Sequence, residues 1–472
     1  MNIVHYFLGL PPLHSGGLQK YVLDLAIIQK KYLKDSKVIL LFPASKSLII
    51  KESRIEYYKK FDDIEIFCIV NPVAFSFNGI RDVKEIIKNR KNNYYSFFKE
   101  KKIDILHVHS LMGFSKDLLL AAIAANVKTI FTTHDYYGIC PKINLFTYKN
   151  EICLDYGDGT ECFYCNRNTS ENRYFNVRYL MIHFPILYFF LYVIGKILKN
   201  ISNLWKMRKK EKNILKSNNV SGLLKNKKYI ILREYYLEIL KRFDIILFNS
   251  NITKSVYNNY LDLANIRNQV LPVTHLDINF KNGKKRCFYV DENCVNILYM
   301  GNLDIKKGFF DLIKVFDEIK KTYTNWQLHI YGDFSNIKLK NYDKNYYKFY
   351  GKYNYNDLKK IFLKANILII PSKWKETFGF IGLEAISHGV PVIVSENVGF
   401  SMLIKNNING IIYKEDTNNK GMKEAIISIL KNPKILYEYN KSILKNNFND
   451  YLLKNHVNKI INIYRKLLVR KI

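Results

Sequence analysis

The sequence predicts an α/β protein with two doubly wound, Rossmann-like domains and a helical insertion between their two sets of strands. Short apolar runs alternate with helical patterns in both halves of the chain, as parallel βαβ units require. The chain has 472 residues, whereas one domain usually takes ~100 to 200. Hydrophobic residues make up 48% of the chain and aromatic residues 15%, which indicates folded cores and excludes a largely disordered chain.

The expected strands are short apolar runs bounded by polar or turn residues. In the first half these runs are residues 3–8, 38–42, 64–70, 103–107 and 129–133, and in the second half 296–300, 326–331, 347–350, 367–370 and 391–394. Apolar residues at helical spacing predict helices at residues 18–28 and 118–124, and around residues 312–319 and 358–365.

These elements divide the chain into three parts. A first domain is expected at residues 1–245, including a helical insertion at residues 171–242. A second domain is expected at residues 246–445, and a final helix at residues 446–472.

The insertion contains an almost wholly apolar run, residues 184–194, beside a lysine-rich flank. A transmembrane helix needs ~20 predominantly apolar residues, and Arg178, Pro185 and Gly195 interrupt this one. The pattern favours a helix that docks on an anionic membrane surface. A helical hairpin buried in the fold and a true span over residues 179–198 remain as alternatives. The flank consists of Lys196, Lys199, Lys206, Arg208, Lys209, Lys210 and Lys212.

The formal net charge is +33, from 74 Lys and Arg against 41 Asp and Glu. A charge of this size attracts anionic partners, which could be nucleic acid, a membrane surface or phosphorylated substrates. Part of the charge can equally be compositional, since Lys, Asn, Ile and Tyr are abundant throughout the chain. The sequence contains no recognisable nucleic-acid-binding module, so nucleic acid is not an expected partner.

The N-terminus reads as a first strand and not as a secretory signal. Residues 1–13 lack the charged n-region and the small-residue cleavage site of such a signal, and their apolar run contains His5. We therefore expect a cytoplasmic protein, in which the seven cysteines serve as thiols or metal ligands and not as disulfides.

Four of the seven cysteines, Cys140, Cys153, Cys162 and Cys165, lie within 26 residues. The closing Cys-x2-Cys can hold one metal from a tight turn, and four thiolates make a closed tetrahedral zinc site. The gaps of twelve and eight residues match no standard zinc ribbon closely. A structural zinc is the expectation, with unligated thiols and disulfides as the alternatives.

The most informative segment is residues 371–385, in which Glu376 and Glu384 stand eight positions apart around Gly379. On one helix the two carboxylates would be ~12 Å apart, beyond the ~5 to 9.5 Å of a glycosidase pair. The separation suits the two ends of one extended ligand. Gly379 would let the backbone amides of Phe380 and Ile381, at the start of the following helix, approach a diphosphate.

This segment resembles the Glu-x7-Glu motif of glycosyltransferase family 4, the retaining enzymes of the GT-B fold. The Phe-Gly pair after Glu376 and the segment at residues 389–393 add to the resemblance, which is best over residues 295–412. It implies that Glu376 contacts the transferred sugar near the reacting carbon and that Glu384 holds the nucleotide ribose. It also implies two domains that face each other across a cleft, with the last helix crossing back to the first.

A second segment, residues 301–308, resembles the strand-to-helix loop of the same family, usually Gly-Arg-Leu followed by Lys-Gly. By this resemblance Gly301 belongs to the donor site and Lys307 neutralises the donor diphosphate. Asn302 stands where the family commonly has arginine, so one phosphate contact is missing unless Lys306 supplies it.

The first half offers two further residues for the site. Gly17 follows the first strand, where glycine permits close approach of the backbone to a phosphate or an acceptor. Residues 132–136 resemble the His-Asp segment of a family 4 branch, whose histidine faces the donor sugar and the acceptor. The resemblance implies a catalytic role for His134, whereas His107 and His109 are expected to be structural.

The resemblance implies a glycosyltransferase that moves a sugar from a nucleotide diphosphate sugar to a lipid-linked or saccharide acceptor. The expected pathway is the synthesis of a cell-surface polysaccharide such as capsule or lipopolysaccharide, on the inner face of the cell membrane. A nucleotide-sugar 2-epimerase of the same fold and a non-catalytic, membrane-docked sugar-nucleotide-binding protein are the alternatives. The sequence has no Asp-x-Asp pair, so no catalytic metal is expected.

Overall fold

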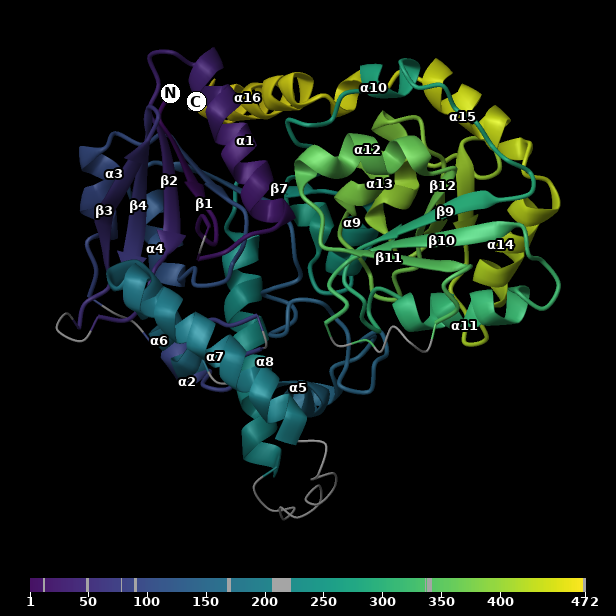
Figure 1. Cartoon of the computed structure of the whole chain (residues 1–472). Helices are drawn as coiled ribbons and strands as arrows, with labels where there is room; N and C mark the ends of the chain where they lie inside the picture. The colour runs from purple at the N-terminus through teal and green to yellow at the C-terminus, as the bar shows by residue number, and fades with distance from the viewer. Residues whose placement is uncertain are drawn as a thin grey trace. The chain divides into compact units, whose positions relative to one another are not determined.

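The computed structural model describes residues 1–11, 13–47, 51–77, 79–88, 91–167, 171–205, 222–335, 337 and 342–469. The chain forms two compact units. Unit 1 comprises residues 1–131, 136–143 and 155–245, and unit 2 comprises residues 132–135, 144–154 and 246–472. Figure 1 follows the chain from purple at the N-terminus to yellow at the C-terminus.

The first sheet has eight strands in the order β3-β4-β2-β1-β5-β6-β7-β8 (Figure 1). The pairs β1–β2, β1–β5, β2–β4, β5–β6 and β7–β8 are parallel, whereas β3 and β4 are antiparallel. The strands are β1 (Ile3–Tyr6), β2 (Val38–Pro43), β3 (Arg54–Phe61), β4 (Ile64–Val70), β5 (Ile105–Val108), β6 (Lys128–Thr133), β7 (Ile245–Phe248) and β8 (Asn268–Val270).

The strands at the centre of this sheet are apolar because helices and loops cover both of their faces. Every residue of β2 is buried, as is usual for a strand inside a parallel sheet. Helix α4 begins where Ser115 caps it, since the Ser115 side chain accepts a hydrogen bond from the Leu118 amide at 3.2 Å. The helices before the insertion are α1 (Gly17–Tyr32), α2 (Lys84–Ile87), α3 (Tyr94–Glu100), α4 (Lys116–Ala124) and α5 (Thr160–Asn166).

The predicted insertion is helical where the structure describes it, with α6 (Glu171–His183), α7 (Pro185–Trp205) and α8 (Gly222–Lys241). Its two outer helices pack into unit 1. Arg178 of α6 is buried and donates from Nε to the Ala44 carbonyl at 2.8 Å. From α8, the Tyr229 hydroxyl donates to the Ile80 carbonyl at 3.0 Å, and Arg233 donates from Nε to the Ile139 carbonyl at 2.9 Å. Buried side chains therefore fix α6 and α8 on unit 1.

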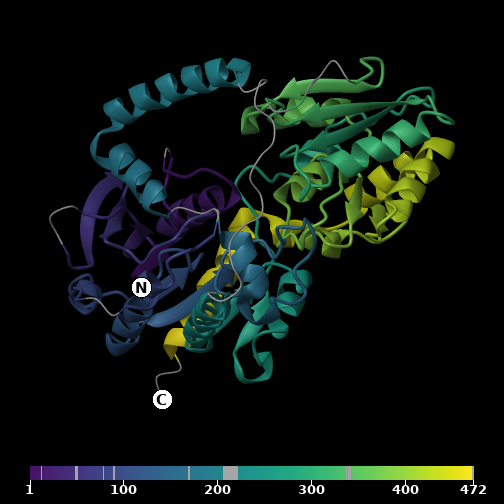
Figure 2. The ribbon, with the colours of Figure 1, turned by 90° about the horizontal axis from the view of Figure 1, so that it is seen from below.

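Helix α7 differs, because its apolar side chains face away from the core. Large apolar residues are exposed along its first three turns, with Ile186 74%, Phe189 62% and Phe190 59% accessible. Figure 2 shows α6 and α7 in teal, following each other at an angle. The alternative of an apolar run buried within the fold is thus wrong for these side chains. The lysine-rich stretch from Lys206 to Lys212 lies outside the described residues.

Among the described residues, none of the helices combines the length and the hydropathy that a membrane span requires.

The second sheet belongs to unit 2 and has six strands in the order β11-β10-β9-β12-β13-β14, all parallel (Figure 1). The strands are β9 (Val295–Met300), β10 (Trp326–Tyr331), β11 (Tyr347–Gly351), β12 (Ile367–Ile370), β13 (Val392–Ser395) and β14 (Gly410–Tyr413). The helices are α9 (Asn251–Asn258), α10 (Lys281–Lys284), α11 (Phe309–Ile319), α12 (Leu358–Lys364), α13 (Phe380–Ser387), α14 (Lys420–Lys431), α15 (Ile435–Lys445) and α16 (Leu453–Val469).

The core of unit 2 lies between this sheet and the helices that cover it. Leu312, Val315, Phe316 and Ile319, which the sequence places on one helical face, are all buried on α11. They join Trp326 of β10 and the buried side chains of α14 in one hydrophobic cluster. The apolar stripe of α11 therefore packs into the core, as its helical spacing predicts.

The prediction of two α/β domains with parallel, Rossmann-like sheets is confirmed. Strands β4, β10 and β12 have the predicted bounds, and seven others differ by one or two residues at an end. Strands β7, β8 and β14 were not predicted. The antiparallel strand β3 was not predicted. Only Ile55 of this strand is buried, and the charged residues around it leave no apolar run in the sequence; they are Arg54, Glu56, Lys59 and Lys60. Charged residues of this kind are typical of an edge strand, which is the place of β3 in the sheet.

Candidate functional site

The loop that follows β12 holds Glu376 in a fixed backbone position. The Glu376 amide donates to the Asn397 carbonyl at 2.8 Å, and the Glu376 carbonyl accepts from the Gly399 amide at 2.9 Å. Together these bonds make a short parallel bridge between Glu376 and Val398, just beyond the end of β13. The carboxylate therefore stands at the carboxyl ends of parallel strands, where open α/β sheets bind their ligands.

Both oxygens of the Glu376 carboxylate have partners. Lys307 Nζ lies 2.7 Å from Oε1, and the buried Ser372 hydroxyl donates to Oε2 at 2.7 Å. The Lys307 and Glu376 side chains are 27% and 12% exposed, so the pair is sheltered but open to a ligand. The two residues predicted to contact different parts of a donor are thus directly paired in unit 2.

The loop before α11 places Lys307 beside this carboxylate. The Lys307 amide donates to Asp304 Oδ1 at 2.8 Å, and the Lys306 carbonyl accepts from the Lys373 amide at 2.8 Å. Gly308 caps α11 with a φ of +69°, and a Cβ there would lie 1.8 Å from the Pro371 carbonyl oxygen. Only glycine fits this turn, so the Lys-Gly pair fixes the approach of the two loops.

Trp374 lies in the same loop and was not predicted as a site residue. Lys307 Nζ is 5.7 Å from the centre of its ring, within the range of a cation–π contact. Within the described residues, the buried Nε1 of Trp374 has no hydrogen-bond partner. A buried indole N–H of this kind is a donor that a bound ligand can use.

Helix α13 begins directly after Gly379, as the sequence predicts. Gly379 has a φ of +94°, and a Cβ there would lie 3.0 Å from Val398 Cγ1 and 3.6 Å from Glu376 Oε1. Phe380 and Ile381 form the first turn and are partly exposed. The first amides of a helix attract anions, and these amides lie on the same segment as Glu376.

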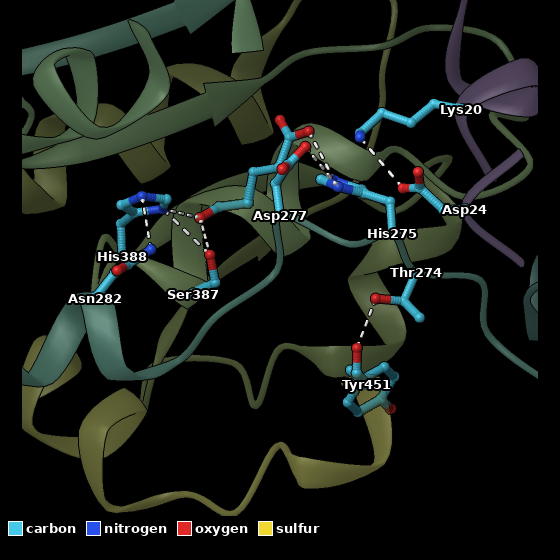
Figure 3. A network of polar contacts seen from close by, with 10 residues as sticks. Lys20, Asp24, Thr274, His275, Asp277, Asn282, Ser387, His388 and Tyr451 are labelled. Atoms are coloured by element: carbon cyan, nitrogen blue, oxygen red, sulfur yellow. Dashed lines mark hydrogen bonds and ion pairs between the residues drawn. The ribbon is translucent and has the colours of Figure 1, made fainter. Parts of the chain in front are cut away.

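Glu384 lies one turn further along α13 and is paired with a histidine that sequence reasoning missed. Its Oε1 is 3.0 Å from Nε2 of His275, and the two side chains are only 5% and 1% exposed. His275 Nδ1 lies 3.7 Å from Asp277, and Figure 3 shows these two side chains next to each other. On the neighbouring turn, the Ser387 hydroxyl donates to the Glu384 carbonyl at 2.8 Å. Glu384 is therefore held from both its side chain and its backbone.

His134 belongs to unit 2, like the two glutamates. Its carbonyl oxygen accepts a hydrogen bond from the Thr377 hydroxyl at 3.0 Å, which ties the His-Asp segment to the residue after Glu376. Burial first, and then repulsion from His456, lowers the pKa of His134 to about 3. The imidazole is therefore neutral at ordinary pH. Its catalytic role stays a prediction.

The remaining predicted donor contacts fall in two places. Gly301 directly follows β9 in unit 2, and its amide donates to the Tyr331 carbonyl at 3.0 Å. Gly17 is the first residue of α1 in unit 1, so its contact with a donor stays a prediction.

The predicted zinc ligands are divided between the units. Cys140, Cys162 and Cys165 belong to unit 1 and Cys153 to unit 2. Arg233 Nη2 lies 3.8 Å from the sulfur of Cys162, close enough for a weak hydrogen bond. Among the described residues, the potential metal ligands that lie close enough to share one ion are histidines and not these cysteines. Zinc at the cysteines therefore stays a prediction.

Solved structures similar to this chain define the class of fold. The chain resembles a sucrose-phosphate synthase from Thermosynechococcus elongatus, with a TM-score of 0.58, 13% identity and 99% of each chain covered. It also resembles a glycosyltransferase from Rickettsia africae, with a TM-score of 0.58, 15% identity and coverage of 100% of this chain and 99% of the other. At these identities the likeness shows the fold, which is the two-domain GT-B layout of glycosyltransferases.

The family comparison is more specific for unit 2. Residues 288–450 match the family model described as glycosyl transferases group 1. The match includes Lys307, Glu376 and Glu384, but not His275 or His134.

Several curated relatives match in part, and two of them bear on function. One is an uncharacterised 41.2 kDa protein in the cps region of Klebsiella pneumoniae, 27% identical over 37% of this chain and 48% of that protein. The other is an uncharacterised glycosyltransferase of Methanocaldococcus jannaschii, 29% identical over 33% of this chain and 42% of that protein. The chain thus spans less than half the length of these relatives.

Proposed function

We propose that this protein is a retaining glycosyltransferase of family 4 that transfers a sugar from a nucleotide diphosphate sugar to an acceptor. The observation that carries the proposal is the Glu376–Lys307 pair, set beside the open first turn of α13 in a glycosyl transferases group 1 domain. A carboxylate, an ammonium group and helix amides match the sugar and the diphosphate of such a donor.

Proteins of similar fold bind ligands of this class. Anabaena HepE was solved in complex with UDP and glucose, with a TM-score of 0.52 and 12% identity to this chain. A trehalose-6-phosphate protein of Escherichia coli was solved with UDP-2-fluoro glucose, with a TM-score of 0.54 and 12% identity. For this chain we propose the same donor class and leave the base and the sugar to experiment.

In the proposed reaction, the protein positions the donor and stabilises the leaving diphosphate. Lys307 and the amides of Phe380 and Ile381 would meet the charge that develops on the leaving phosphate. Attack would come from the face that the diphosphate leaves, which retains the anomeric configuration. Because the sequence has no Asp-x-Asp pair to hold a divalent cation, we propose that transfer needs no metal.

The acceptor is proposed to be lipid-linked and to serve cell-surface polysaccharide synthesis. The cps region that holds the Klebsiella relative and the exposed apolar face of α7 support this proposal. The test is to incubate the protein with a panel of nucleotide sugars and a membrane extract, and to identify the products by mass spectrometry. Transfer that depends on the extract supports the proposal. An epimerised nucleotide sugar formed without extract would indicate a 2-epimerase, and binding without any product would indicate a non-catalytic protein.

Donor affinity is predicted to depend on Lys307 and Glu384, the two charged residues expected to contact the diphosphate and the ribose. Lys307→Ala and Glu384→Ala should each weaken donor binding by about 1.5 to 3 kcal/mol, the usual loss for a hydrogen bond to a charged group. Isothermal calorimetry with the preferred donor measures this loss. Lys321→Ala, an exposed lysine just after α11, is the matched control and should bind normally. Unchanged binding in both site variants would refute these two roles.

Membrane docking is predicted to use the exposed apolar face of α7. The double variant Phe189→Ser, Phe190→Ser should abolish pelleting with anionic vesicles. Each ring is more than half exposed in the protein and would be buried in lipid on docking. High salt should release the wild-type protein, since it screens the attraction between the basic chain and the lipid headgroups.

The control for docking is Tyr57→Ser, which removes an equally exposed ring from β3. Its pelleting should equal that of the wild type. Retention of wild-type protein after salt and alkaline carbonate would instead indicate an integral protein. Absence of pelleting would refute docking, and with it the proposed place on the inner face of the cell membrane.

A further inference from the structure

Three histidines meet in the core of unit 1. His5 lies on β1, His107 on β5 and His109 directly after β5, and all three side chains are fully buried. The ring centres are 5.5 Å apart for His5 and His107, 5.3 Å for His5 and His109, and 4.1 Å for His107 and His109. One ring nitrogen from each histidine lies within 4.8 Å of the other two.

The sheet and helix α1 fix this histidine cluster. His5 and His107 are register partners on the adjacent parallel strands β1 and β5, so their side chains lie on one face. His109 follows two residues after His107 and lies against both rings. Helix α1 covers this face with Gln29, which bonds His5, and with Tyr21, whose ring meets His109 edge-on at 5.7 Å. Two of the three rings therefore lie on strands of the sheet, and His109 directly follows one of these strands.

The hydrogen bond from Gln29 determines which nitrogen of His5 carries the proton. Gln29 Oε1 lies 2.6 Å from Nε2 of His5, and an amide oxygen only accepts hydrogen bonds. The proton of His5 is therefore on Nε2, and the lone pair of Nδ1 points to His109 Nε2, 3.0 Å away. Metal-binding histidines commonly donate their outer N–H to a carbonyl or carboxylate in this way.

We propose that His5, His107 and His109 form a binding site for a divalent transition-metal ion, with zinc as the reference ion. Three nitrogens at ~2.0 Å from a tetrahedral zinc ion lie ~3.3 Å apart, so the observed spacing needs only small side-chain movements. Neutral imidazoles suit zinc, nickel, cobalt and copper, whereas magnesium and calcium prefer oxygen ligands.

The competing interpretation is a hydrogen-bonded histidine network without metal. The 3.0 Å contact between His5 and His109 would then be an N–H···N bond. That bond requires two rings, whereas the cluster brings a nitrogen of His107 into the same small volume. Each neutral imidazole keeps one nitrogen without a proton, so three rings this close can offer three lone pairs to one ion. A metal ion uses all three of them.

A metal at this site would link β1 to β5 beneath α1 and stabilise unit 1. Three imidazoles bring no negative charge, so we expect weaker zinc affinity than at a site of four thiolates. The site lies in a different place from the predicted cysteine site, and the two are separable by their ligand atoms.

The test uses the full chain after removal of metal. Zinc affinity is measured by competition with a chromophoric chelator, and the coordination is read from the visible spectrum of the cobalt(II) form. We expect an ion whose spectrum shows tetrahedral nitrogen ligands and which survives Cys162→Ser, whether or not the cysteines bind a second ion. His109→Gln should weaken zinc binding at least about 100-fold, and Gln29→Leu, which removes the amide that supports His5, about 10- to 100-fold.

His183→Gln, an exposed histidine of α6, is the matched control and should bind zinc like the wild type. Equal zinc affinity in wild type and His109→Gln would overturn the proposal. A cobalt spectrum without bands of nitrogen ligands, with or without Cys162→Ser, or absence of binding by the wild-type chain, would also overturn it. The wild-type spectrum decides the matter even if the histidine variants do not fold.

Discussion

Glu376→Ala is expected to abolish sugar transfer while the chain stays folded. The carboxylate is the acidic group of the proposed site nearest to Lys307, and its backbone is fixed by bonds that the variant keeps. Loss of one preorganised electrostatic group usually lowers turnover by about 100- to 1,000-fold. The ion pair is partly exposed, so its loss should reduce the free energy of unfolding by only about 1 kcal/mol. Turnover with the preferred donor and thermal unfolding measure the two effects.

The control for this prediction is Glu318→Ala. Glu318 is an exposed glutamate of α11 that is also paired with a lysine, Lys423, at 2.8 Å. Its removal costs an ion pair of similar length away from the proposed site, so turnover should stay normal. Near-normal turnover in Glu376→Ala would show that the reacting sugar lies elsewhere.

Gly308→Ala is expected to damage both stability and donor binding, although residue 308 has no side chain to contact a ligand. The left-handed backbone at φ +69° alone costs an alanine roughly 1 to 2 kcal/mol, and the Cβ would overlap the Pro371 carbonyl oxygen at 1.8 Å. The loop must therefore move, and Lys307 moves with it. We expect a lower unfolding temperature and weaker donor affinity, measured by calorimetry of unfolding and of binding.

Gly195→Ala in α7 is the matched control, since nothing lies within 4 Å of a Cβ at that position. Alanine is the better helix former, so this variant should be as stable as the wild type or more so. If Gly308→Ala were equally harmless, the close approach of the two loops would not hold in solution.

The sequence predicts the central strands well because their apolar runs are local signals. Residues 326–331 and 367–370 form β10 and β12 with the expected bounds, since buried parallel strands need apolar side chains at every position or at every second one. Strand β3 has no such signal, because one face of an edge strand meets solvent. The insertion was predicted as helical, but the difference between α6 and α8, which pack on unit 1, and the exposed α7 depends on partners such as the Ala44 carbonyl, far away in the chain.

For the site, the sequence locates the residues but not their pairing. Glu376, Glu384 and Lys307 were found because their spacing and neighbours repeat a family motif. Their contacts join segments that are 69 residues apart for Lys307 and Glu376, and 109 residues apart for His275 and Glu384. A local sequence pattern cannot predict a contact between residues so far apart in the chain. The histidine cluster was missed for the same reason, because His5 meets His109 only through the register of β1 and β5.

When no donor is bound, the Glu376 carboxylate neutralises the charge of the Lys307 ammonium group. A diphosphate that draws the lysine away frees the carboxylate for the sugar, so the two halves of the donor would be recognised together. After transfer the sugar leaves with the acceptor, and Glu376 can compete with the spent nucleoside diphosphate for the same ammonium group. The contact would thereby speed product release, and Glu376→Ala should retain the nucleoside diphosphate longer than the wild type does.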